Sequence, residues 1–122
     1  MDVYRPAVEG GRYDLIFAIE DRLVRVQCKW ASLKHDVLLV RCYSCRRARE
    51  GMRVRRYTPA EVDAIAAYSA DTQDCYLLPP AIWSNRRGVH LRLRPALNNQ
   101  RRKINWAPDF ELGATLSRLR GP

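Results

Sequence analysis

The sequence has 122 residues and no run of apolar residues approaching the roughly 18–20 that a membrane-spanning helix needs. Residues 1–6 lack the apolar core of a signal peptide. We therefore expect a cytoplasmic protein without a membrane partner, in which the four cysteines are reduced thiols. A glycine-rich phosphate loop, a Ser-His-Asp set, internal repeats and low-complexity segments are also missing. The sequence therefore indicates neither a nucleotide-binding P-loop nor a serine-hydrolase site.

Acidic residues are scarce, with 13 Asp and Glu against 22 Lys and Arg, and the formal net charge is +9. Such an excess predicts a polyanionic partner. DNA-binding modules, ribosomal proteins and nucleases fit, whereas an acidic membrane surface fits less well because no basic amphipathic helix is evident. The hydrophobic content of 47% is typical of a folded protein. The length predicts a single domain over residues 1–122 with a modest core.

Two strand-like runs, residues 12–19 and 22–30, are separated only by an acidic dipeptide. If this dipeptide is the tip of a hairpin, the numbers of facing residues sum to 41. Asp14 then lies opposite Gln27, and Lys29 is its diagonal neighbour, within reach of a long side chain. A carboxylate, an amide and an ammonium on one face could bind a divalent metal and a phosphate.

The same spacing has a simpler interpretation, in which Asp14 and Lys29 form a half-exposed salt bridge on an ordinary two-faced sheet. The alternation along the second run predicts that its apolar members share one buried face and its polar members the other. The predicted buried set is Val24, Val26, Cys28 and Trp30.

The rest of the sequence predicts a β-β-β-α-β-β-α order. Residues 36–43 form a third strand-like run, and residues 74–78 and 88–94 predict two more strands. The segment 58–61, Thr-Pro-Ala-Glu, has the residues of a helix start, and apolar residues at helical spacing extend the predicted helix to about Ser69. Pro108 could open a short last helix. The fold class is therefore mixed α/β, or α+β, with one central sheet.

Residues 46–56 predict a basic loop with six arginines in eleven residues. Like charges this close repel one another unless an anion neutralises them, so we expect a contact with nucleic-acid phosphates; a solvated loop is the alternative. A second basic cluster lies near the C-terminus. The predicted nucleic-acid-binding residues are Arg46, Arg47, Arg49, Arg53, Arg55, Arg56, Arg101, Arg102 and Lys103.

Cys42 and Cys45 form a CxxC pair that could contribute to a zinc site with Cys28, Cys75 or His35. A second closely spaced pair of ligands is missing from the sequence. Buried or incidental thiols are therefore the preferred interpretation of these cysteines.

Several short segments, taken in order and spacing, resemble the PD-(D/E)XK nuclease superfamily. Within it they look like the branch that contains a cyanobacterial group I intron homing endonuclease and its small bacterial and phage relatives. The segments are residues 12–15, 26–29, 57–63, 76–79, 91–93, 98–100 and 104–107. The resemblance covers about residues 3–110.

The resemblance implies a restriction-endonuclease-like core, a mixed sheet flanked by helices. The usual N-terminal helix with its metal-binding glutamate has no counterpart in the sequence. It also implies roles: Asp14 as metal ligand, Gln27 at the second acidic position, and Lys29 as catalytic lysine. The backbone carbonyl of Cys28 would be a further metal ligand. The implied cofactor is Mg²⁺, with Mn²⁺ as a substitute, and the implied partners are double-stranded DNA and further copies of the chain in a dimer or tetramer.

The leading functional hypothesis is a metal-dependent DNA endonuclease of a mobile element or phage. A catalytically degenerate DNA-binding protein on the same fold is the second hypothesis. A small basic RNA-binding protein is the third, and it requires the register of Asp14, Gln27 and Lys29 to be a coincidence.

Overall fold

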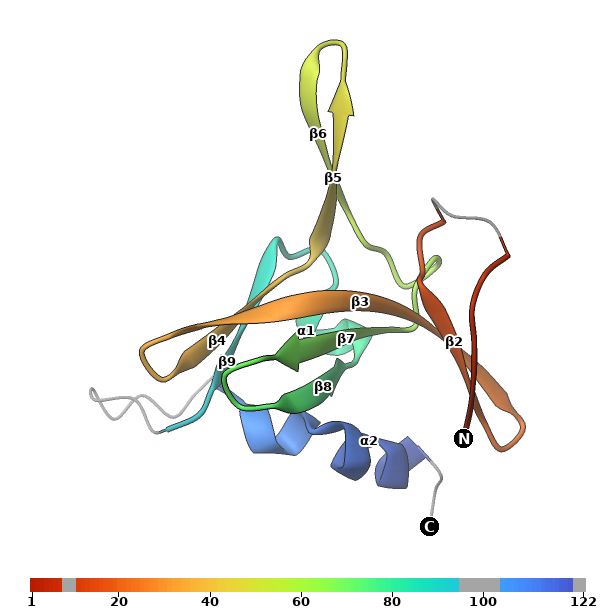
Figure 1. Cartoon of the computed structure of the whole chain (residues 1–122), viewed down its shortest axis with the longest axis vertical. Helices are drawn as coiled ribbons and strands as arrows, with labels where there is room; N and C mark the ends of the chain where they lie inside the picture. The colour runs from red at the N-terminus through yellow and green to blue at the C-terminus, as the bar shows by residue number, and fades with distance from the viewer. Residues whose placement is uncertain (8–10, 95–103, 120–122) are drawn as a thin grey trace.

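One long strand, β3 (Arg22–Lys34), organises the fold of the computed structural model, which describes residues 1–7, 11–94 and 104–119. Along its length β3 pairs with β2 (Leu15–Ile19), β4 (Val37–Arg41) and β7 (Ala64–Ser69) (Figure 1). The other strands extend the sheet: β1 (Asp2–Tyr4) beside β2, β8 (Asp74–Leu78) beside β7, β9 (Gly88–Arg92) beside β4, and β10 (Asn105–Trp106) beside β9. Within the described residues this sheet has eight strands, of which β3–β7 and β9–β10 are the parallel pairs. The predicted mixed α/β fold with one central sheet is confirmed.

The β2–β3 hairpin has the predicted register, with Leu15 opposite Val26 and Ile19 opposite Arg22. Glu20 in its turn has φ 56°, the left-handed conformation that two-residue hairpin turns use. The ladder continues one bond further, because the Asp14 N–H donates to the Val26 carbonyl at 2.8 Å. The residue just outside β2 is therefore held in place beside β3.

The predicted helix over residues 58–69 is wrong. The expected start does form one turn, since Thr58 Oγ1 donates to Glu61 Oε1 at 2.9 Å and the Val62 N–H reaches the Thr58 carbonyl at 3.0 Å. The chain then enters β7, Ala64–Ser69, which runs parallel to β3 between β3 and β8. A strand buried on both faces is apolar almost throughout and lacks the alternation that marks an exposed strand.

The two faces of β7 belong to two hydrophobic clusters. Ile65 and Ala67 pack in the larger cluster with residues of β4, β8 and β9. The cluster also contains the fully buried Trp83, which follows β8 and whose Nε1 donates to the Leu78 carbonyl at 2.9 Å. The second cluster, on the other face, contains Phe17, Ile19, Val24, Val26, Ala64, Ala66 and Leu77. The small side chains of β7 allow the sheet to be covered closely on both sides.

The helices within the described residues are short. They are α1 (Pro80–Trp83), the 3₁₀ turn η1 (Ala107–Phe110) and α2 (Leu112–Leu119). Pro108 thus lies in a 3₁₀ turn, and the last α-helix begins four residues later than predicted. Leu112 and Leu116 of α2 pack against the second cluster, which places this helix under β8 (Figure 1). None of the helices described here is long and apolar enough to cross a membrane.

Only half of the predicted buried face of β3 is buried. Val24 and Val26 lie in the second cluster, whereas Cys28 is exposed and Trp30 is 72% exposed. The Trp30 ring meets Tyr68 edge-on, with centroids 5.6 Å apart. Alternation predicted which side chains share a face, but not where along the strand the covering elements end.

The predicted basic loop over residues 46–56 is instead most of a β-hairpin. Its strands, β5 (Tyr43–Ala48) and β6 (Gly51–Arg56), form a separate two-stranded sheet that projects from the body of the protein (Figure 1). Gly51 at the start of β6 has φ +115°, a conformation that L side chains rarely adopt. Met52 and Val54 alternate with arginines along β6, a strand pattern that the high charge obscured.

A hydrogen-bonded ion pair between Arg25 and Asp63 links the 58–63 turn to β3. Asp63 accepts hydrogen bonds from the Arg25 side chain on both carboxylate oxygens, at 2.9 and 3.0 Å, and from the Arg25 N–H at 2.8 Å. Arg25 also donates to the Ala60 carbonyl at 2.8 Å. The hydrogen bonds from Arg25 hold the pKa of Asp63 below its usual value. This pair fixes the point where the chain turns into β7.

We predict that Asp63→Asn lowers the free energy of unfolding at neutral pH by an amount that shrinks in acid. A carboxyl with a depressed pKa contributes stability above its unfolded pKa, about 3.9, and loses it as the pH falls through the lower folded value. Urea unfolding of parent and variant between neutral pH and about pH 3 measures this difference. The exposed Asp71→Asn is the control. A difference that does not change with pH would contradict the assigned role.

Candidate active site

Three polar groups meet where Asp14 precedes β2 and faces the middle of β3. Asp14 Oδ2 accepts a hydrogen bond from Gln27 Nε2 at 2.8 Å and from the Cys28 N–H at 3.1 Å. Asp14 is exposed and Gln27 half-buried, so the group is open to solvent. The contact between Asp14 and Gln27 follows directly from the hairpin register.

The Gln27 amide lies between two oxygen atoms. Its Nε2 is 2.8 Å from Asp14 Oδ2 and 3.3 Å from the Cys28 carbonyl oxygen. Because both oxygens carry negative charge or partial charge, the position that the Gln27 N–H group occupies between them would also suit a cation. Rotation of the terminal amide would present the Gln27 oxygen instead, and three oxygen ligands with added water suit Mg²⁺. The described residues contain no group of three or more His, Cys, Asp and Glu side chains that could hold a metal, so Asp14 would be the anionic ligand.

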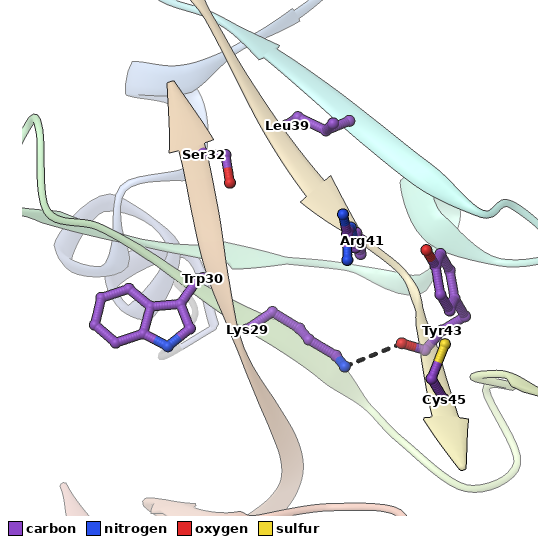
Figure 2. Close-up of a pocket in the computed structure, with 7 residues that line it drawn as sticks. All are labelled: Lys29, Trp30, Ser32, Leu39, Arg41, Tyr43 and Cys45. Atoms are coloured by element: carbon purple, nitrogen blue, oxygen red, sulfur yellow. Dashed lines mark hydrogen bonds between the residues drawn. The ribbon is translucent and has the colours of Figure 1, made fainter. Parts of the chain in front are cut away.

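Lys29 lies beside this group without pairing with it. Its Nζ donates to the Tyr43 carbonyl at 3.0 Å, as Figure 2 shows, and lies 5.1 Å from the centroid of the Tyr57 ring. Asp14 and Lys29 form no ion pair within 4.0 Å, so the simple salt-bridge interpretation is wrong. A carbonyl and a ring orient the ammonium but do not neutralise its charge, which leaves it available to a phosphate.

Arg12 and Tyr57 are part of the site and were not predicted. Tyr57 is only 3% exposed, and its ring lies 4.6 Å from Arg12 Cζ as well as near Lys29. The ring therefore positions two cations through its negative face. Arg12 is two residues before Asp14, within the run that the sequence predicts as a strand, and this spacing could have identified it as a neighbour on the same face.

Arg12 also joins the site to the β5–β6 hairpin. Its guanidinium donates to Ser44 Oγ at 2.9 Å and to the Arg56 carbonyl at 2.8 Å. Arg12 Nε lies 3.0 Å from Glu61 Oε2 but lacks hydrogen-bond geometry. The same Glu61 oxygen accepts a hydrogen bond from Arg55 at 2.8 Å. The base of the hairpin is thus held against the segment that carries Asp14.

An open depression of about 860 Å³ contains these groups. Asp14, Gln27 and Lys29 line one wall, and Arg53 and Arg55 of the hairpin line another. Its lining carries four cationic side chains, Arg12 included, and one carboxylate. The depression therefore has the size and charge to receive a phosphodiester group beside the Asp14 carboxylate.

The other predicted contact residues are divided between the hairpin and undescribed segments. Arg49 lies at the hairpin tip, and the backbones of Arg46 and Arg47 pair with β6. Arg53 has a weak pair with Glu50 at 3.4 Å, and both side chains are largely exposed. Arg56 donates to a backbone carbonyl. The remaining predicted residues, Arg101, Arg102 and Lys103, lie outside the described residues.

The CxxC pair is split between the interior and the surface. Cys42 is fully buried in the larger cluster, and burial raises the pKa of its thiol to about 11. Cys45 is exposed and lines the depression. Because a metal binds the thiolate, the high pKa of Cys42 disfavours it as a ligand.

The family model described as PD-(D/E)XK endonuclease matches residues 1–113. The chain therefore belongs to the PD-(D/E)XK endonuclease family, as the sequence segments indicated. Its fold is similar to that of the bacterial homing endonuclease I-Ssp6803I, with a TM-score of 0.70 and 23% sequence identity. The alignment covers 98% of this chain and 80% of that one. A search of curated proteins finds no match.

Proposed function

We propose that this protein is a metal-dependent endonuclease that hydrolyses phosphodiester bonds of double-stranded DNA. The observation that carries the proposal is the convergence of Asp14 Oδ2 and the Cys28 carbonyl on one point, filled by the Gln27 amide. Lys29 lies next to this point and has no ion pair with any residue in the described part of the chain. Membership of an endonuclease family supports the reaction class.

Each residue has a separate task in this proposal. Asp14, the Cys28 carbonyl and Gln27 hold the metal, which when bound polarises the phosphate and lowers the pKa of a water molecule. Lys29 places its ammonium where negative charge develops on the phosphate oxygens. The Tyr43 carbonyl and the Tyr57 ring hold this ammonium in position before substrate arrives, so little reorganisation is needed in the transition state.

We propose that the β5–β6 hairpin carries much of the DNA contact. A two-stranded β-ribbon fits the major groove of B-DNA. The hairpin projects beyond the body of the protein, and all its residues in β6 are exposed (Figure 1). Arg49, Arg53 and Arg56 then contact phosphates on either side of the groove. Because one ribbon covers few base pairs, a long site requires several copies, and we expect a dimer or tetramer.

A plasmid cleavage assay tests the proposal. Supercoiled DNA should be nicked or linearised in Mg²⁺ or Mn²⁺, and EDTA should stop the reaction. The assay includes Mn²⁺ because this ion binds the same oxygen ligands and can occupy a site that binds Mg²⁺ weakly. Absence of cleavage with both ions, in a chain that still binds DNA, would contradict endonuclease activity. Stronger binding to RNA than to DNA would contradict the proposed substrate.

One observation favours a second candidate, a DNA-binding protein that has lost catalysis. Asp14 is the one carboxylate in the lining of the depression, within the part of the chain that is described. A site with a single anionic ligand binds a divalent cation more weakly than one with two. The cleavage assay separates the two candidates directly.

We predict that replacing Arg49, Arg53 and Arg56 by alanine flattens the salt dependence of DNA binding. Each phosphate contact contributes roughly −0.9 to the slope of log K against log salt, so three lost contacts change the slope by about 2.7. The control replaces Arg5, Arg22 and Arg86 by alanine. These arginines are exposed outside the hairpin, so the control removes the same amount of charge. Fluorescence anisotropy at several salt concentrations measures both slopes. Equal slopes in the two triple variants would mean that the hairpin is only solvated.

A further inference from the structure

Beyond the depression, β3, β4 and β9 present one side of the sheet to solvent. The pairing registers place Ser32, Leu39 and His90 in one row across this side, and Lys34, Val37 and Arg92 in the next. Trp30 and Arg41 extend the same side towards the depression. These eight residues, here called the open face, are all exposed or half-buried.

The open face is positively charged. Lys34 and Arg41 are exposed and have no ion pair with any described residue, and Arg92 uses its Nε to reach the Arg94 carbonyl at 3.1 Å. The one carboxylate at its edge, Asp36, lies 3.8 Å from Arg94. The cations of the open face are therefore not neutralised within the described chain, which fits a polyanionic partner.

The open face is continuous with the candidate active site. A second depression runs over Trp30, Ser32, Leu39 and Arg41, and Lys29 forms part of its lining (Figure 2). Lys29 and Cys45 line both this depression and the one that contains Asp14. By alternation Lys29 belongs to the other side of β3 from Ser32 and Lys34, but its side chain reaches towards β5, where the two depressions meet. A molecule bound at the active site can thus pass Lys29 into the second depression.

We propose that the open face is a second DNA-contact surface, which binds the duplex beside the scissile phosphate. This inference rests on the proposed endonuclease function. Lys34 lies five positions beyond Lys29 in β3, about 17 Å further along the strand axis at the rise of a β-strand. That length corresponds to about five base pairs of duplex. Lys34, Arg41 and Arg92 contact phosphates there, and Leu39 lies against the groove between them.

Charge favours DNA over a second copy of the chain as the occupant. In a symmetric dimer the same patch meets itself, so Lys34 and Arg41 would face the Lys34 and Arg41 of the partner. Opposed like charges at an interface cost several kcal/mol. The phosphates of a duplex instead neutralise each of these cations.

The first test compares Lys34→Ala/Arg41→Ala with Arg5→Ala/Arg22→Ala, a control that removes the same charge elsewhere. Binding of a fluorescent duplex is measured by anisotropy between about 50 and 200 mM salt. Two lost phosphate contacts should flatten the slope by about 1.8 and weaken binding on the order of 30-fold at about 0.15 M salt. The control should bind and cut as the parent does.

A second test locates the DNA. A photo-crosslinking amino acid replaces Leu39 on the open face or Leu23, which is exposed at the other end of β3. Leu39 lies opposite Ser32, about 10 Å along β3 from Lys29. The probe at position 39 should therefore cross-link to DNA about three base pairs from the cut, and the probe at position 23 should not.

The outcomes separate this inference from the proposed function. If the parent does not bind duplex DNA, the proposed function and the assignment of the open face are both wrong. If the hairpin triple variant weakens binding while Lys34→Ala/Arg41→Ala behaves as its control, only the open face is wrongly assigned. A cross-link from position 39 to another copy of the protein would identify the face as a protein interface and overturn the inference.

Discussion

Replacement of Lys29 by alanine is expected to lower the rate of DNA cleavage on the order of 10²–10³-fold, the loss that removal of one oriented charge-stabilising donor produces. The Lys29 ammonium is held by the Tyr43 carbonyl and the Tyr57 ring, and it forms no ion pair with a carboxylate of the described residues. Its charge acts chiefly on the transition state. DNA affinity should change far less, because binding is distributed over many arginines.

Single-turnover cleavage at saturating DNA measures this effect, and anisotropy measures the Kd. Arg22→Ala, which removes one exposed cation from the same strand, is the control. Thermal unfolding establishes that Lys29→Ala remains folded after losing its hydrogen bond to the hairpin base. Equal cleavage rates for parent and Lys29→Ala would show that this lysine has no catalytic role.

Asp14→Asn should reduce cleavage at least about 100-fold. Loss of a residue that only hydrogen-bonds to a metal ligand typically costs 10–100-fold in metal affinity or activity, and this change alters the proposed ligand itself. Asparagine has nearly the size of aspartate and its oxygen can still accept from Gln27 Nε2 and the Cys28 N–H. The change therefore removes the anionic ligand with little effect on the hairpin. DNA should bind as tightly or more tightly, because one negative charge leaves the depression.

Two measurements distinguish a metal ligand from a structural aspartate. Calorimetric titration with Mn²⁺ should show weakened binding in Asp14→Asn, independently of cleavage. Addition of Gln27→Glu in the same background returns one carboxylate to the point between the two oxygens and should recover part of the Mn²⁺ affinity. Unchanged Mn²⁺ binding in Asp14→Asn would exclude Asp14 as a ligand.

The contacts made within the β2–β3 hairpin were predictable from sequence. Alternation and a two-residue turn set the register, so Asp14 had to meet Gln27 across the pair. Such contacts join residues close in sequence and depend on few choices. The partners of Lys29 were not predictable, because the Tyr43 carbonyl and Tyr57 reach it through the path of β4 and the following hairpin.

The errors share a physical cause. The segment 58–69 combines a helix-start sequence with alanines, and its local preference for helix was overridden by the parallel position of Ala64–Ser69 beside β3. The arginines of residues 46–56 resembled a solvated loop, although Met52 and Val54 follow a strand alternation. Trp30 is apolar and yet exposed. In each case the neighbours in space, and not the local sequence, decided the outcome.

The sequence by itself determined the excess of positive charge, the β2–β3 register and the meeting of Asp14 with Gln27, because these depend on composition and on local alternation. Only the tertiary structure decided that β7 is a buried strand and that the arginine-rich segment is a projecting hairpin. It also decided that Lys29 is held by neutral groups while β3, β4 and β9 leave a cationic face open. These features arise from contacts between distant segments, whose energies exceed the local preferences that a sequence reveals.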